Sequence, residues 1–264
     1  MVSPQQRSTH RPRYPSFAAL VLFAGLLGPG YAQTRATLTV SAAASLKKAL
    51  VDAEAAYSQS HADVDFINNF ASSGTLAAQI DQGAPVDVFL SAAAKPMDGL
   101  ESKGLIAAGT RRNLLRNTLV LIAPVDSRLR DFQGLADSSI RSIALGDSAS
   151  VPAGQYAQQT LAALHLLDTL RPKFVFGSDV RQVLTFVETG NADAGLVYAT
   201  DAQASLKVRI VAVAPESAHD PIVYPAAVIK GSRAEVAARS FVEYLGTPPA
   251  KKIFMDHGFT MAAQ

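Results

Sequence analysis

The 264-residue chain contains no cysteine. This absence excludes disulfide-bonded scaffolds, thiolate metal sites and cysteine nucleophiles. It also argues against an N-terminal lipid anchor, which needs a cysteine after the signal. The 17 Gly and 14 Pro residues show no period, so collagen-like and low-complexity chains are excluded. Because 48% of the residues are hydrophobic, the chain has enough apolar surface to fold rather than stay disordered.

The chain also has little net charge of either sign. The formal value is +2, but residues 1–32 hold Arg7, Arg11 and Arg13 and no acidic residue. Without these three, 21 Lys and Arg stand against 22 Asp and Glu, a net charge of −1 for the remainder. We therefore expect no nucleic-acid partner and no attraction to anionic membranes, because both need a basic field.

No apolar run is long enough to cross a membrane, which takes about 20 residues. The run at 17–28 follows a basic segment and precedes Pro29-Gly30, and Gly30 and Ala32 supply the small residues of a cleavage site. These features are typical of a secretory signal peptide. We predict that residues 1–32 are removed on export and that the mature chain begins near Gln33.

Enzyme signatures are missing as well. The sequence has no Gly-x-Ser-x-Gly elbow, phosphate-binding loop, dinucleotide fingerprint or His-Glu-x-x-His pair. Its histidines beyond the signal share no metal-ligand spacing: His61, His165, His219 and His257. No pair of carboxylates suggests acid–base catalysis. Asp81, Asp87 and Asp201 fall at element ends, where we expect them to cap helices or stay solvated.

What the sequence does contain is an alternation of β-branched runs with helical patterns, which predicts an α/β protein with largely parallel sheets. The expected strands are 36–40, 64–69, 86–90, 117–123, 142–145, 173–176, 194–198, 208–214 and 222–229. The first expected helix follows 42–46 and runs through 57, the second covers 72–82, and the third ends near 103. Further helices are expected at 151–166, 179–189, 200–204, 233–245 and 248–257.

Four of these helices begin with small or hydroxyl residues, at 44–45, 72–74, 152–154 and 178–180. A helix N-terminus presents free N–H groups and a partial positive charge, which suits an anion. Such turns lie at the carboxyl ends of the strands, where α/β proteins bind ligands. Each turn alone is ordinary capping chemistry, with Ser178 the expected N-cap of its helix. Together they favour an anion site without identifying the anion.

Six segments carry a resemblance to a known family: 40–46, 69–76, 83–92, 151–157, 179–184 and 195–202. In this order they resemble the periplasmic molybdate-binding proteins of molybdate ABC importers, as do 223–229 and 258–260. The resemblance implies a two-lobed type II periplasmic binding fold, each lobe a mostly parallel sheet flanked by helices. Lobe 1 would comprise 33–117 and 225–264, and lobe 2 would comprise 118–224. Two crossover strands, near 117–119 and 223–226, would join them.

The resemblance also implies a set of ligand-binding residues. Hydroxyl and backbone N–H groups of Ser45 and Ser73, backbone N–H groups of Ala153 and Val180, and the Tyr198 hydroxyl would contact the oxygens of the anion rather than its metal. The family often has a third serine where this chain has Gly74, and the register favours Ser73 over Ser72. A donor-only set suits a dianion that carries no proton. None of these residues is a carboxylate acceptor for a protonated phosphate, and none is Arg or Lys.

The resemblance therefore implies a monomeric periplasmic binding protein, not an enzyme, that captures molybdate or tungstate, needs no cofactor, and delivers its ligand to the membrane permease of an ABC importer. One alternative is a binding protein for sulfate or another tetrahedral oxyanion, which only cavity size could reject. An organic-acid or amino-acid binder is the second alternative. It would need an Arg to bind the carboxylate and an acidic group to bind the amine, and neither can be placed at the four turns. A secreted hydrolase or transferase on an α/β scaffold is the third alternative, and it lacks a visible partner that would activate Ser45 or Ser73.

Overall fold

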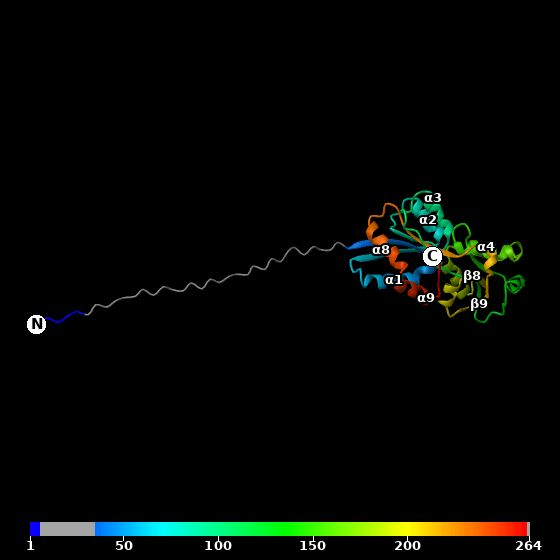
Figure 1. The fold of residues 1–264 in the computed structure, drawn as a ribbon. Coiled ribbons are helices and arrows are strands. Elements are labelled where there is room, and N and C mark those ends of the chain that lie inside the picture. The colour runs from blue at the N-terminus through cyan, green and yellow to red at the C-terminus, as the bar shows by residue number, and fades with distance from the viewer. Residues whose placement is uncertain (6–34, 263–264) are drawn as a thin grey trace. The chain divides into compact units, whose positions relative to one another are not determined.

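Residues 1–5 and 35–262 are described by the computed structural model. The predicted cleavage site and nearly all of the predicted signal peptide lie outside the described residues. Residues 35–262 build two β-sheets with helices packed on them, as the sequence predicted. In Figure 1 the blue, cyan and orange-to-red elements surround one sheet, and the green and yellow elements surround the other.

The first sheet has the strand order β11-β4-β10-β3-β1-β2. Its strands are β1 (Ala36–Ala43), β2 (Val64–Ala71), β3 (Val88–Leu90), β4 (Arg112–Arg116), β10 (Val223–Val228) and β11 (Thr260–Met261). The second sheet has the order β7-β6-β8-β5-β9. It consists of β5 (Leu119–Pro124), β6 (Ile143–Gly146), β7 (Phe174–Gly177), β8 (Ala194–Tyr198) and β9 (Val208–Val213).

Most strands in each sheet run in one direction. β1 is parallel to β2 and β3, and β6 is parallel to β7 and β8. The reversed strands are β10 and β11 in the first sheet and β5 in the second. β5 and β10 are the strands that follow a passage from one sheet to the other, and this passage reverses their direction. Most strands of each sheet therefore point the same way, but both sheets contain antiparallel as well as parallel strand pairs.

The chain passes between the sheets twice. It leaves β4 and enters β5 through Asn117 and Thr118, and it returns between β9 and β10. The two passages lie side by side, because the backbone N–H of Asn117 donates to the carbonyl of Ile222 at 3.3 Å. The lobe boundaries assigned from the sequence remain a prediction.

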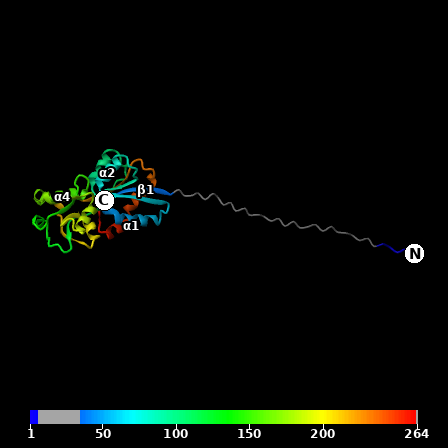
Figure 2. The same cartoon turned by 180° about the vertical axis from the view of Figure 1, so that it is seen from behind.

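Helices cover both faces of the first sheet. α1 (Lys47–Ser58), α8 (Glu235–Leu245) and α9 (Pro248–Asp256) lie on one side, and α2 (Ser73–Asp81) and α3 (Ala94–Ser102) lie together on the other (Figures 1 and 2). The strand pattern explains this division, because alternate residues of a strand face opposite ways. Val88 and Leu90 of β3 belong to the core under α1, whereas Phe89 packs with α2 and α3.

The second sheet carries α4 (Pro152–Ala163), α5 (Leu167–Leu170), α6 (Val180–Glu188) and α7 (Ala199–Gln203). Short 3-10 helices are η1 (Ala44–Leu46), η2 (Gln133–Ala136), η3 (Arg171–Lys173) and η4 (Glu216–Ala218). α4 begins at Pro152, a residue whose fixed φ suits the first helical position. The predicted helix over 151–166 is wrong at its end, because His165 adopts a left-handed φ of 58° that stops α4 and separates it from α5.

Two strands, β4 and β11, were missed from the sequence. β4 has exposed arginines at both ends, and β11 has only two residues. None of the helices in the described part of the chain combines the length and apolarity that a membrane crossing requires.

Candidate functional site

A small cavity lies where the carboxyl ends of strands from both sheets meet. Its volume is about 10 Å³, room for about one water-sized sphere. The lining comes from the ends of β1, β2, β3 and β8 and from the starts of η1, α2, α4 and α6. Its residues are Ala43, Ala44, Ser45, Ala71, Ser72, Ser73, Ala92, Val151, Pro152, Ala153, Asp179, Val180 and Tyr198. All five predicted ligand residues are among them, so the fold brings together residues that are far apart in sequence.

Backbone N–H groups are the main polar feature of this cavity. Those of Ser45, Ser73, Ala153 and Val180 have no hydrogen-bond partner among residues 35–262. Each belongs to the first turn of η1, α2, α4 or α6, where no preceding carbonyl of the helix is within reach. The N-termini of four helical turns therefore aim unpaired donors and partial positive charge at one small space.

Ser72 and Ser73 have different tasks at the start of α2. Ser72 is the N-cap residue, since its Oγ accepts the Thr75 N–H at 3.3 Å and donates to the Thr75 Oγ1 at 2.7 Å. Ser73 is fully buried, and its Oγ accepts the N–H of Ala92 at 2.8 Å. A hydroxyl whose oxygen already accepts one bond still has its proton to donate. Ser73, rather than Ser72, therefore offers a free hydroxyl donor to the cavity.

Tyr198 ends β8 and precedes α7. Its hydroxyl donates to the carbonyl of Ala92 at 3.4 Å, a long bond that a stronger acceptor could replace. Burial holds the pKa of Tyr198 well above its ordinary value, so the phenol keeps its proton and remains a donor.

Asp179 corrects the expected N-cap of α6 and adds a carboxylate to the cavity rim. It is the N-cap of α6 in place of the predicted Ser178, because its Oδ1 accepts the N–H groups of Arg181 and Gln182 at 2.8 and 3.0 Å. Those bonds occupy the next two donors of the helix and leave the N–H of Val180 for the cavity. Asp179 is half-exposed at the cavity rim. Asp179 is not one of the five predicted ligand residues, but it adds a carboxylate at the rim, so the donor set alone does not exclude a protonated anion.

Comparison with known proteins decides the family. The family model for bacterial extracellular solute-binding proteins matches residues 38–260. The chain belongs to this family. Its similarity to individual relatives extends over most of their length as well. The chain is 44% identical to a putative ABC transporter substrate-binding lipoprotein, YvgL, of Bacillus subtilis. The matched 230 residues cover 86% of this chain and 88% of the relative.

Two further relatives carry a ligand in their names. The chain is 42% identical over 230 residues, 85% of this chain and 89% of the relative, to the molybdate-binding protein ModA of Escherichia coli. Among solved structures, the periplasmic molybdate-binding protein of Azotobacter vinelandii superimposes with a TM-score of 0.77 at 27% identity, covering 86% of this chain and all of that one. The two-lobed α/β fold of this solute-binding protein is thus shown by its sheets and by its relatives together.

A buried ion pair lies behind the cavity of the solute-binding protein. Asp201 of α7 is fully buried, and its Oδ1 lies 2.9 Å from Nε of Arg181. Burial raises the pKa of Asp201 to about 7, against the lowering effect of Arg181. The expectation of a capping or solvated carboxylate is wrong here, because helix α7 packs its polar residue inward. Local sequence gave no signal of this, since the partner lies on another helix.

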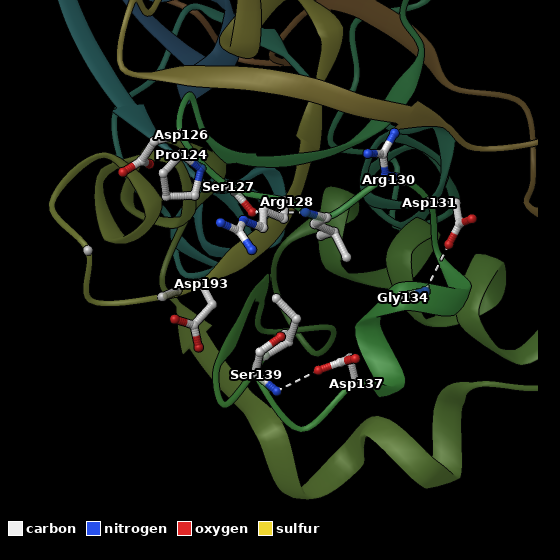
Figure 3. Close-up of a pocket in the computed structure, with 14 residues that line it drawn as sticks. Pro124, Asp126, Ser127, Arg128, Arg130, Asp131, Gly134, Asp137, Ser139 and Asp193 are labelled. Carbon is white, nitrogen blue, oxygen red and sulfur yellow. Dashed lines mark hydrogen bonds between the residues drawn. The ribbon is translucent and has the colours of Figure 1, made fainter.

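A larger pocket of about 720 Å³ lies on the second sheet, at the end opposite the small cavity (Figure 3). Two of its carboxylates accept hydrogen bonds within local backbone turns. Asp131 accepts the N–H of Gly134 at 2.8 Å, and Asp137 accepts the N–H of Ser139 at 2.7 Å. None of the predicted ligand residues lines it. The small cavity between the sheets is therefore the better candidate site of this solute-binding protein.

Proposed function

We propose that this solute-binding protein captures molybdate, and the similarly shaped tungstate, and delivers it to the membrane permease of an ABC importer. The observation that carries the proposal is the convergence of four unpaired backbone N–H groups on a cavity of about 10 Å³. The names of the relatives from E. coli and A. vinelandii support the choice of ligand. A cavity this small favours a compact oxyanion over a sugar or an amino acid.

The donor chemistry favours a compact dianion. A tetrahedral oxyanion offers only acceptor oxygens, which the N–H groups and the hydroxyls of Ser45, Ser73 and Tyr198 would saturate. Each such bond is charge-assisted, and therefore stronger than a bond between neutral groups. Among residues 35–262, no Lys, Arg or His lines the cavity, so the charge of the ligand would be balanced by helix N-termini. Oxygen contacts alone would hold the ligand, and no other cofactor is needed.

Two other oxyanions remain as alternatives. Sulfate has the same shape and charge with a smaller radius, so donors alone do not reject it. Phosphate carries a proton near neutral pH, and the Asp179 carboxylate at the rim could accept it. That carboxylate would also repel the anion, which makes phosphate the weaker alternative.

A thermal-shift and calorimetric panel of molybdate, tungstate, sulfate and phosphate on the mature protein tests the ligand. Binding stabilises the folded state by about 4 kcal/mol at a thousandfold excess of ligand over Kd. We expect molybdate and tungstate to raise the melting temperature by several degrees at micromolar concentration, and phosphate to have no effect at millimolar. If sulfate matches molybdate at equal concentration, the molybdate proposal is wrong.

We also infer that the chain is a carrier and not an enzyme. The hydroxyl of Ser45 meets a tyrosine, and that of Ser73 meets a backbone N–H, so neither has a base that would activate it. The ligand should therefore be recovered chemically unchanged after release. Detection of a turnover product would overturn this inference.

Export and shape complete the proposal. The intact mass of protein secreted by a Gram-negative host should show cleavage after Ala32, and a mature species that still carries residues 17–28 would contradict the predicted signal peptide.

Because donors lie on both lobes, we expect the lobes to close on the ligand. Small-angle scattering should show a monomer whose radius of gyration falls when molybdate is added. An identical profile at saturating ligand would indicate a preformed, rigid site.

A further inference from the structure

Behind the cavity, the hydroxyl of Ser45 has one side-chain partner. Its Oγ lies 3.1 Å from the hydroxyl oxygen of Tyr224. Tyr224 belongs to β10, is 1% exposed, and does not line the cavity. It follows directly on the chain's second passage between the sheets. A residue that touches the ligand-side hydroxyl from behind can decide which way that hydroxyl points.

Asn117 favours one direction of this hydrogen bond. The Asn117 Oδ1 accepts the N–H of Thr118 at 2.9 Å, which fixes the orientation of the amide. Its Nδ2 then faces the Tyr224 hydroxyl at 3.2 Å and the Thr200 Oγ1 at 2.9 Å. An amide nitrogen only donates, so the Tyr224 oxygen accepts from Asn117. The single proton of Tyr224 is then available to donate to the Oγ of Ser45, 3.1 Å away.

The aromatic surroundings hold Tyr224 in this position. Its ring packs edge-on against Tyr198, with centroids 5.8 Å apart, and against Phe259 at 5.5 Å. Burial keeps the pKa of Tyr224 well above its ordinary value, so the hydroxyl stays protonated. The ring therefore has little freedom to turn its hydroxyl away from Ser45.

We propose that Tyr224 is a positioning residue for oxyanion binding: it donates to the Oγ of Ser45, supported by Asn117, and so leaves the Ser45 proton free to point into the cavity. The proposal deepens the proposed function and rests on it. A chain of hydrogen bonds that all run in one direction also polarises its members, which strengthens the last donor. Ser45 would then reach the ligand already oriented, rather than losing rotational freedom on binding.

The first test is Tyr224→Phe, with molybdate affinity measured by calorimetry. Loss of one buried hydrogen bond should raise the Kd roughly threefold to tenfold. Tyr57→Phe is the matched control, because Tyr57 is equally buried and its hydroxyl donates to the Oγ of Ser240 at 3.0 Å, on the first lobe away from the cavity. We expect Tyr57→Phe to lower the melting temperature without changing the Kd. Equal effects of the two variants on the Kd would overturn the proposal.

A double-mutant cycle separates positioning from a general structural role. In a Ser45→Ala background there is no hydroxyl to orient, so adding Tyr224→Phe should leave the Kd unchanged. If the two substitutions multiply their effects instead, Tyr224 does not act through Ser45. Should Tyr224→Phe fail to fold, Asn117→Ala removes the donor that sets the direction, and its effect on the Kd should likewise vanish without Ser45.

The outcomes distinguish this inference from the proposed function. If wild-type protein binds molybdate but the cycle is additive, only the role of Tyr224 is wrong. If wild-type protein binds sulfate and not molybdate, the proposed ligand is wrong, and the same cycle measured with sulfate decides the role of Tyr224.

Discussion

Gly74 is the residue at which a single methyl group should most affect closure of the two lobes. It lies in the first turn of α2, and its N–H donates to the carbonyl of Ser150, in the loop between β6 and α4, at 2.9 Å. This bond joins the two lobes beside the cavity. A Cβ at position 74 would lie 2.5 Å from the Ser150 oxygen and 2.8 Å from its Cα. Both are backbone atoms, so no side chain can rotate away.

The structure sets the size of the effect. Ordinary contact needs 3.4 Å or more, so Gly74→Ala must push the lobes apart by about 1 Å, which breaks a hydrogen bond of 2.9 Å. Its loss is worth about 0.5–1.5 kcal/mol. The same movement stretches the bonds from Ala153 and Val180 to a ligand held by Ser45 and Ser73. We expect the Kd for molybdate to rise roughly tenfold or more, chiefly through faster dissociation.

Calorimetry suits this measurement because the chain contains no tryptophan to report closure. Gly99→Ala is the matched control: Gly99 is also helical, in α3, and a Cβ there meets nothing within 4 Å. Both variants should keep or slightly raise the melting temperature of the ligand-free protein, since alanine favours helix. Only Gly74→Ala should lose affinity. If Gly74→Ala binds as wild type does, the lobes do not close through this contact and the reasoning is refuted.

Three further outcomes are expected. Ser45→Ala and Ser73→Ala each remove a hydrogen bond to a charged acceptor and should raise the molybdate Kd, measured by calorimetry, about tenfold to a hundredfold. Val180→Ile keeps the backbone N–H and should be nearly silent in the same titration; loss of binding by a folded Val180→Ile would show that the side chain matters. Burial raises the pKa of Glu54 to about 7, so ionisation costs the folded state about 3 kcal/mol. The folded state holds the proton more tightly than the unfolded state, and the free energy of unfolding should therefore fall between about pH 4.5 and 7. Burial raises the pKa of Asp201 to about 7 as well, so Asp201 contributes to the same fall; in urea unfolding Glu54→Gln should make the fall shallower, and an unchanged slope would contradict it.

The sequence allowed the elements and the turns to be predicted because both depend on neighbouring residues. Alternating patterns placed most strands, and the small residues at helix starts indicated the anion site. The predictions failed where contacts between residues far apart in the sequence determine the structure. Asp201 is buried beside Arg181, which reaches it from another helix. The pairing of β4 with β10 and β11 depends on segments over a hundred residues away. The positions of Tyr224 and Asn117 behind Ser45 could likewise be seen only in the folded chain.

A binding site whose donors belong largely to the main chain has a consequence for how its selectivity can change. At Ala153 and Val180 the group facing the cavity is common to every residue except proline. Side-chain identity at these positions can therefore drift while the donors remain, provided that the new side chain fits behind them. Adjusting the site to a different oxyanion requires a change in the path of the loops that set the spacing between donors. Redesign should begin with loop length and with Gly74, before any charge is introduced.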